Sequence, residues 1–291
     1  MKNDISRLLS VRIFLVCILC FCLTTSHAQE LKRYFNLKDA LANPDDVEWI
    51  ELRTKSLKVF PIELYEFPNL KYLDLSNSGI LIIPDSISVL KNLRFLNLSG
   101  SGVEKLPESL DQLESLTTLG LSNLADFDLD SAIPILAEIS SLKSLDLKYD
   151  NLEELPPAIQ LLQQIEILDL SGNPIRSLPD EFALLPRLQT LYLNDDRELN
   201  LDQSIKVLAK IPSLYELHLE NIGVESIPKT MTQLKKVRYL YLNRNQIKTL
   251  PTSLNDMQNM RYLDLTANPI SSPYLIDPRL SPLIKINFGN R

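Results

Sequence analysis

Histidine and cysteine, which often act as nucleophiles, proton carriers or metal ligands, are scarce in this 291-residue chain. His218 is the lone histidine beyond the first 28 residues, and the three cysteines all precede residue 23. Asp146 and Asp169 stand 23 positions apart in the chain. Two carboxylates about 5 Å apart would suit a retaining glycosidase. The first question is therefore whether the fold brings these two aspartates together.

A second acidic stretch, DFDLD at residues 126–130, resembles the start of a calcium-binding loop. Ser131 stands where such a loop needs glycine, and Ala137 stands where it needs a bidentate glutamate. Polar residues recur at the equivalent places 72 residues later, which favours helix capping over calcium binding. Since a lone histidine has no partners for a metal site, we predict no metal, no cofactor and no catalytic residue.

The N-terminus resembles an export signal. Basic residues precede the apolar run IFLVCILCFCL at residues 13–23, and Ala28 offers a cleavage site before Gln29. Eleven apolar residues are too few to span a bilayer, which needs about 20. We therefore predict a signal peptide over residues 1–28, secretion or periplasmic location, and no stable membrane insertion after cleavage.

Removal of residues 1–28 changes the formal net charge from −7 to −9, because the segment carries three basic groups and one acidic group. An acidic chain is a poor match for nucleic acid or an anionic membrane surface. The mature chain has no cysteine, which excludes disulfides and thiol catalysis.

The elements that must position these residues follow from a repeat. LKYLDLSNSGILIIPDSISVLKN (residues 70–92) returns 23 residues later as LRFLNLSGSGVEKLPESLDQLES. The frame has ten starts, each apolar at its first, fourth and sixth residues: Val47, Leu70, Leu93, Leu116, Leu142, Ile165, Leu188, Leu214, Val237 and Met260. Self-similarity at a fixed period indicates a solenoid.

The repeated turn resembles the leucine-rich-repeat family, with its LxxLxLxxNxLxxLPxxLxxL consensus; LDLSGNPIRSLPDEFALLPR (168–187) fits it almost throughout. The resemblance implies an α/β solenoid, a right-handed curved superhelix with about ten short parallel strands on the concave face. It predicts that Leu73, Leu96, Leu145 and Leu168 form one interior row. Ser171 is expected on the surface.

Most turns carry an apolar-proline pair, which predicts extended or 3₁₀ outer segments rather than long helices. The two 26-residue turns, 116–141 and 188–213, lack that pair. We expect α-helices there, with Asp130 and Asp202 as N-caps. The ninth residue of seven turns is expected to bond to the backbone, as asparagine or as a serine or aspartate substitute such as Asp150 or Asp196; Lys55, Leu124 and Ile222 at this position cannot do so.

The chain is therefore divided into a signal peptide (1–28), an N-terminal helical cap (29–46), a ten-turn array (47–272) and an irregular C-terminal cap (273–291). The helix of the N-terminal cap is predicted over residues 36–46, with Asn36 as N-cap and a stop at Asn43-Pro44.

Equal strand positions form columns of touching side chains on the concave face, because adjacent strands lie about 4.8 Å apart. Exposed aromatic residues are expected to gather at both ends of the arc. Asp146 and Asp169 become column neighbours, and on an open, wet surface near Lys148 we expect a solvated pair rather than catalysis. The candidate partner-binding residues are Trp49, Tyr72, Phe95, Tyr192, His218, Tyr239, Tyr241 and Tyr262.

Resemblance to the family implies protein–protein interaction. The leading prediction is a non-enzymatic exported protein that holds a protein partner on its concave face. A glycan-binding or adhesion protein of the cell envelope is the alternative, since aromatic rings beside carboxylates suit sugars. An intracellular scaffold for small GTPases is the second alternative, if the N-terminus is not cleaved.

Overall fold

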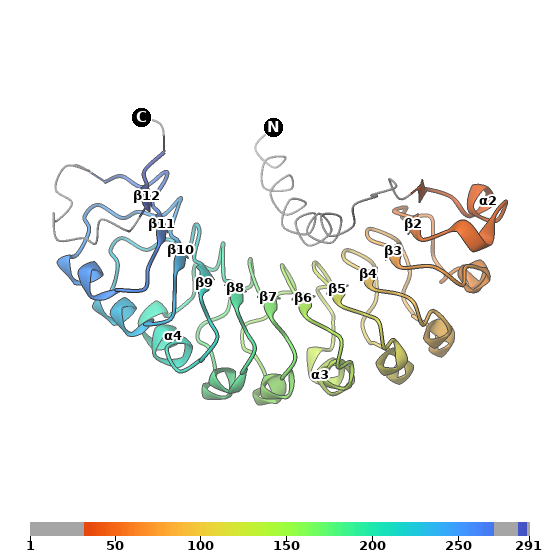
Figure 1. The fold of residues 1–291 in the computed structure, drawn as a ribbon, viewed down its shortest axis with the longest axis horizontal. Coiled ribbons are helices and arrows are strands. Elements are labelled where there is room, and N and C mark those ends of the chain that lie inside the picture. Colours follow the sequence, from red (N-terminus) through yellow and green to blue (C-terminus); the bar gives the residue numbers. More distant parts are fainter. Residues whose placement is uncertain (1–31, 271–284, 290–291) are drawn as a thin grey trace.

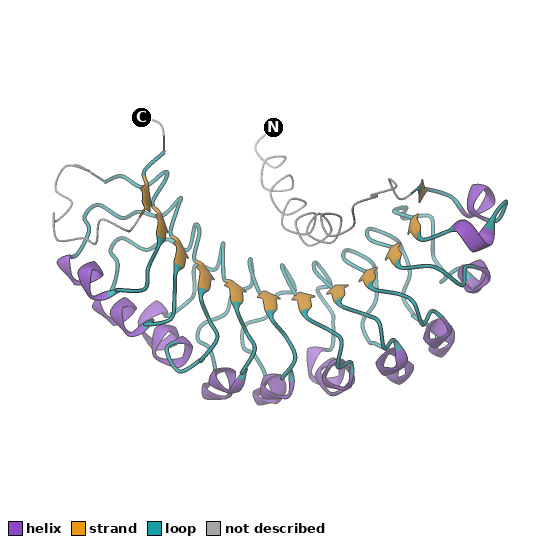
Figure 2. Cartoon of the chain, in the orientation of Figure 1, coloured by secondary structure: helices purple, strands orange, loops and turns teal. Residues whose placement is uncertain are grey.

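The chain folds into a curved solenoid. In the computed structural model, residues 32–270 and 285–289 are described, so the predicted signal peptide and most of the predicted C-terminal cap lie outside these residues. Figure 1 shows an arc with the strands along its inner side, and Figure 2 shows helical segments along its outer side. The leucine-rich-repeat solenoid predicted from the repeat is confirmed.

The strands form one sheet in chain order, and every described pairing is parallel. Each strand occupies the same position in its turn, because each turn of the solenoid brings the chain back beside the preceding strand. The strands are β1 (Arg33–Tyr34), β2 (Trp49–Glu51), β3 (Tyr72–Asp74), β4 (Phe95–Asn97), β5 (Thr118–Gly120), β6 (Ser144–Asp146), β7 (Ile167–Asp169), β8 (Thr190–Tyr192), β9 (Glu216–His218), β10 (Tyr239–Tyr241), β11 (Tyr262–Asp264) and β12 (Lys285–Asn287).

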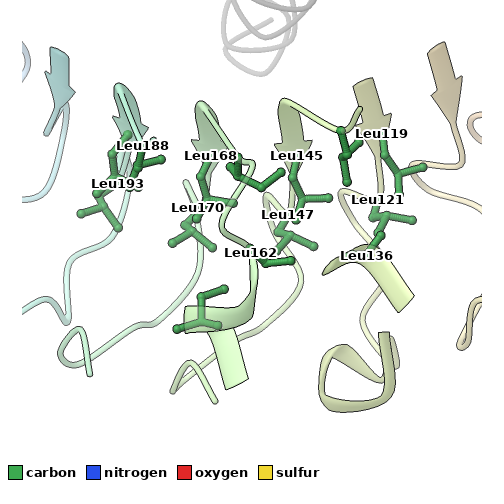
Figure 3. Close-up of a cluster of buried hydrophobic side chains, with 14 of the residues drawn as sticks. Leu119, Leu121, Leu136, Leu145, Leu147, Leu162, Leu168, Leu170, Leu188 and Leu193 are labelled. Atoms are coloured by element: carbon green, nitrogen blue, oxygen red, sulfur yellow. The ribbon is translucent and has the colours of Figure 1, made fainter. Parts of the chain in front are cut away.

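The middle residue of each strand points into the coil. Leu73 pairs with Leu96 across β3 and β4, and Leu145 pairs with Leu168 across β6 and β7. All four side chains are buried, in one continuous core cluster. Figure 3 shows this interior with Leu145 and Leu168 side by side, each above the leucine two residues further on. The predicted interior row is confirmed.

The outer segments follow the proline pattern. Most turns carry short 3₁₀ segments there: Ile62–Glu66, Asp85–Val89, Glu108–Gln112, Pro157–Leu161, Asp180–Leu184, Lys229–Gln233 and Thr252–Asp256. The two 26-residue turns, which lack the apolar-proline pair, carry α3 (Leu129–Glu138) and α4 (Leu201–Leu208), as predicted.

The predicted caps of these two helices are wrong by two residues. Asp128 caps α3 by accepting from the Ser131 backbone N–H at 3.1 Å, and Asn200 caps α4 in the same way. Asp130 and Asp202 lie in the first helical turn instead. Both acidic positions suit a helix start, since the first turn also favours negative charge. The N-cap is the earlier residue of each pair, because its side chain is the one that accepts from the backbone N–H three residues later.

The sheet extends beyond the ten predicted turns at both ends. β1 and the short helix α2 (Leu37–Ala40) cover the first turn, and a 3₁₀ segment follows at Pro44–Asp46. Asn36 caps α2 as predicted, but the helix ends at Ala40, earlier than Asn43. At the other end β12 pairs with β11, which corrects the expectation of an irregular C-terminal cap at these residues.

A ladder of asparagine side chains ties the turns together inside the coil. Asn173 Oδ1 accepts from the backbone N–H groups of Asp150 at 2.8 Å and Leu152 at 3.1 Å. Its Nδ2 donates to the carbonyls of Leu147 at 2.8 Å and Leu170 at 2.7 Å. Asn245 repeats this pattern of two carbonyl acceptors three turns later. Each asparagine therefore satisfies backbone groups of two turns.

Two turns carry aspartate at this ladder position. Asp150 Oδ1 accepts from the Leu124 N–H at 2.7 Å, but Asp150 Oδ2 is buried without a hydrogen-bond partner among the described residues. Neither carboxyl oxygen of Asp196 has a well-formed hydrogen bond within the described part of the chain, although the backbone N–H groups of Glu198 and Ile175 lie near enough to oppose the rise of its pKa. Burial raises the pKa of Asp150 to about 8 and the pKa of Asp196 to about 7. A protonated carboxyl group regains the donor that asparagine has.

Candidate binding surface

The residues on either side of each buried leucine form two columns on the concave face. The strand register pairs Trp49 with Tyr72, and Tyr241 with Asp264, as the repeat predicted. All eight predicted partner-binding residues lie in these columns. The sheet therefore brings them onto one surface, in one group near each end of the array.

The N-terminal group is an aromatic stack. The rings of Trp49 and Tyr72 are stacked with centroids 4.8 Å apart, and the Phe95 ring lies 6.3 Å beyond Tyr72. Arg33 lies over the outer face of the stack, 4.2 Å from the Trp49 ring centroid. Trp49 Nε1 donates to Glu51 Oε1 at 3.0 Å. The stack therefore ends in a cation–π contact with Arg33, and a hydrogen bond to Glu51 fixes the Trp49 ring.

The C-terminal group contains a titratable ring. His218 lies between Tyr192 and Tyr241, with centroid distances of 4.1 Å and 4.0 Å. Its Nε2 is 3.0 Å from Glu216 Oε1, and its Nδ1 is 3.4 Å from Glu220 Oε1. Burial alone would lower the pKa of His218, but the two carboxylates outweigh it and raise the pKa above its usual value. Only a protonated imidazole donates from both nitrogens.

The expectation that these aromatic side chains are exposed is wrong for five of the eight. Trp49, Tyr72, Phe95, Tyr192 and His218 are buried, each 7% or 8% exposed. Rings on strands less than 5 Å apart stack on one another, so their faces are covered by their neighbours. The candidate residues that remain open are Tyr239, at 38% exposure, and the partly buried Tyr241 and Tyr262.

Asp146 and Asp169 lie side by side in β6 and β7, but they are not a solvated pair. Both are buried, and Lys148 Nζ lies 2.9 Å from Asp146 Oδ2 and 3.5 Å from Asp169 Oδ2. Burial, with Asp169 adding to it, raises the pKa of Asp146 to about 6 despite the opposing charge of Lys148. Lys148 is itself buried and pairs with both carboxylates.

The other oxygen of each aspartate closes a turn. Asp146 Oδ1 accepts from the Lys148 N–H at 3.1 Å, and Asp169 Oδ1 accepts from the Ser171 N–H at 3.0 Å. The same bond recurs at Asp74 and Asp264. These carboxylates end their strands by holding the backbone two residues on. Because these carboxylates bond to backbone N–H groups and to Lys148, we assign them a structural role.

Ser171 is buried, so its predicted surface position is wrong. Its Oγ accepts from the Asn194 N–H of the following turn at 3.2 Å. Ser99 makes the same bond to the Ser122 N–H at 3.1 Å. Residues that follow a strand therefore link successive turns instead of facing solvent freely.

A third column, at the rim of the concave face, was not identified from the sequence. The eighth residue of each turn from the second onward has a left-handed backbone: Asn77, Gly100, Asn123, Tyr149, Gly172, Asp195, Asn221, Arg244 and Ala267. Asparagine and glycine tolerate this conformation best. The enrichment of asparagine and glycine at the eighth position is the sequence pattern that could have indicated this column. Tyr149 is the bulkiest departure from it and is 46% exposed.

Two other kinds of site have no candidate within the described residues. No group of three or more histidine, cysteine, aspartate or glutamate side chains there is arranged to hold a metal ion. Across residues 32–270 and 285–289, no helix has both the length and the apolar character to cross a membrane.

Comparison with known proteins agrees with the architecture. A model of the leucine-rich-repeat region matches residues 129–272, and a leucine-rich-repeat model matches residues 69–90. No curated protein matches the sequence.

Several solved structures have a similar fold. An internalin (InlF) from Listeria monocytogenes is 20% identical, with a TM-score of 0.53 over 84% of this chain and 82% of that protein. TLR13, solved in a complex with ssRNA13, is 25% identical, with a TM-score of 0.61 over 77% of this chain and 33% of TLR13. The match to InlF concerns the fold alone. With its repeat, its parallel sheet and these family matches, the chain belongs to the leucine-rich-repeat family, whose members support protein interactions.

Proposed function

We propose that this chain is an exported, non-enzymatic binding protein that holds a protein partner on the C-terminal part of its concave face. The observation that carries this proposal is the open side chain of Tyr239, with Tyr241 two residues on in the same strand β10 and Tyr262 opposite it in β11. Tyrosine supplies a large contact area with little loss of conformational freedom, and it is enriched among residues that dominate interface energies.

The surroundings of Tyr239 support a rigid docking surface. Its ring meets the Tyr215 ring edge-on, with centroids 6.3 Å apart. The neighbouring stack of Tyr192, His218 and Tyr241 fixes the adjacent column. A partner would therefore meet side chains that are already ordered, which lowers the entropic cost of binding.

Export is the second part of the proposal. It is supported by the signal-like segment at residues 1–28. Mass spectrometry of the protein recovered from each cell fraction tests it directly. We expect a mature N-terminus at Gln29 outside the cytoplasm. An uncleaved chain in the cytoplasm would favour the GTPase-scaffold alternative.

The docking surface is tested by affinity capture from the envelope and secreted fractions. The tagged mature chain is compared with Tyr239→Ala and Tyr262→Ala, and Leu184→Ala serves as a matched control. Leu184 is an exposed apolar residue on the convex side. We expect the tyrosine variants to lose the captured protein and the leucine variant to keep it. Capture that survives both tyrosine changes would move the site elsewhere.

A further inference from the structure

Tyr149 is held in an unusual way at the rim of the arc. Its φ is 57°, a left-handed conformation that a bulky side chain rarely adopts. The repeat imposes this conformation on the eighth residue of every turn from the second onward, so the unusual feature is the bulky side chain. This side chain remains 46% exposed, so burial in the core does not explain the choice of tyrosine. Residues held in strained backbone conformations persist where the surrounding structure fixes them, and such residues gather at functional sites.

Gly172 provides the room for the Tyr149 ring. A side chain at Gly172 would place its Cβ 2.1 Å from Tyr149 Cε1 and 2.2 Å from Cδ1. The ring therefore packs directly over the backbone of the following turn. Beyond Gly172, the Tyr149 hydroxyl donates to Asp195 Oδ2 at 3.2 Å, two turns away. The ring is thus fixed at its base, at its edge and at its hydroxyl.

The polar groups beside this ring form a short chain. Asn221 Nδ2 donates to Asp195 Oδ1 at 2.6 Å, and Arg197 Nη2 donates to Asn221 Oδ1 at 3.4 Å. Asp195 and Arg197 are exposed and carry opposite charges. The group therefore offers both donors and acceptors beside an aromatic ring, with no net charge. A neutral, hydroxyl-rich ligand matches these features better than a cation or an anion does.

The aromatic stacks of the concave face lack this property. The rings of Tyr72, Tyr192 and His218 are covered by their neighbours and are at most 8% exposed. A sugar ring binds by laying an apolar face on an aromatic ring while its hydroxyls reach polar groups. Tyr149 combines an open ring with such groups at its side.

We propose that Tyr149, Asp195, Asn221 and Arg197 form a carbohydrate-binding site at the rim of the arc. Tyr149 supplies the stacking surface, and the three polar side chains bond to the hydroxyls of a pyranose unit. This site does not depend on the docking surface around Tyr239, which lies in β10 on the sheet itself. A protein that docks on Tyr149 instead of a sugar is the competing outcome.

The test is a calorimetric titration of the mature chain with soluble tetrasaccharides of known linkage: β1,4- and β1,3-linked glucose, α1,4-linked glucose, β1,4-linked N-acetylglucosamine and β1,4-linked mannose. We expect at least one to bind at up to about 10 mM ligand. Failure of all five would overturn the proposal and leave the concave-face proposal untouched.

Variants then locate the site. Tyr149→Ala should weaken binding at least tenfold, since stacking on one ring contributes that much affinity. Gly172→Ala should also weaken it, because the new Cβ displaces the ring while tyrosine remains present. Tyr239→Ala is the matched control and should leave sugar affinity unchanged. Unchanged affinity in a folded Tyr149→Ala variant, or loss of protein capture alone, would overturn the assignment.

Discussion

The interior and the concave face of this arc are built from the same strands, yet they follow different rules. From β3 to β11 the middle residue of each strand is leucine, and all of these leucines are buried. The residue just before it on the concave side ranges from Phe95 through Thr118 to Glu216. The repeat therefore fixes the shape through the interior, while the face is free to vary. The predictions below test that division.

The largest effect is expected in the interior. Leu168→Ala should lower the free energy of unfolding by about 2–5 kcal/mol, because it leaves a cavity in a packed row. Leu184→Ala makes the same chemical change on the convex surface, where the side chain is 56% exposed, and should cost at most about 0.5 kcal/mol. Urea denaturation of both variants measures the difference. Equal costs would contradict the inside–outside assignment.

The ladder position gives the next effect, with a defined pH dependence. The folded pKa of Asp196 is raised to about 7, so the folded state holds its proton more tightly than the unfolded chain does. Stability is lost as pH rises from about 4 towards 7, and the loss is complete above that. Asp196→Asn should therefore stabilise the chain by about 1–3 kcal/mol at pH 8 and by little at pH 4.

Thermal unfolding at pH 4 and pH 8 checks this prediction. Asp195→Asn is the matched control, since Asp195 is the exposed neighbour in sequence. The reverse change inside the ladder, Asn173→Asp, should destabilise the chain, because it removes the two donors to Leu147 and Leu170. A stabilising effect of Asp196→Asn that is equal at both pH values would refute the titration.

The histidine of the concave stack should contribute a smaller pH dependence in the same direction, with stability falling as pH rises. The pKa of His218 is raised, so its stabilisation is present in full below about pH 6.5 and is lost as pH rises through the folded pKa. His218→Phe keeps a ring between Tyr192 and Tyr241 but cannot bond to the two glutamates. We expect a loss of about 1–2 kcal/mol at pH 6 that shrinks as the pH rises through the folded pKa of His218. A loss that does not change with pH would show that the ring alone matters.

Among the buried positions, Ser171→Ala should have the smallest effect on folding. Its hydroxyl accepts a backbone N–H of the next turn in a buried setting. We expect a cost of about 1 kcal/mol for a buried N–H left without that partner, measured by urea denaturation. A cost near zero would show that this hydrogen bond contributes nothing to stability, and it would favour the exposed position that the repeat predicted for Ser171.

The fold could be predicted from the sequence because one interior pattern repeats through ten turns. Leu145 and Leu168 follow from spacing alone, and so do the helices in the two longer turns. The caps of these helices do not, because Asp128 and Asp130 have suitable side chains and only the chain path distinguishes them. Local geometry of this kind is not encoded in a spacing.

The candidate surface was predicted only in outline. The columns were correct because the register follows from the repeat. The degree of exposure was not, because it depends on how neighbouring side chains pack: Tyr72 is covered by its neighbours, and Lys148 pairs with two buried aspartates. Tyr149 was not predicted, because the eighth residue of each turn is defined by its left-handed backbone conformation and not by the hydrophobic repeat. Its signal is the asparagine and glycine preference at the eighth position.

The most direct test of the central claim is hydrogen–deuterium exchange of the mature chain with and without its captured protein partner. We expect protection in peptides that cover β9, β10 and β11 and no change in the convex segments Asp180–Leu184 and Lys229–Gln233. Protection confined to the convex segments, with the concave strands unchanged, would contradict the assignment of binding to the variable face.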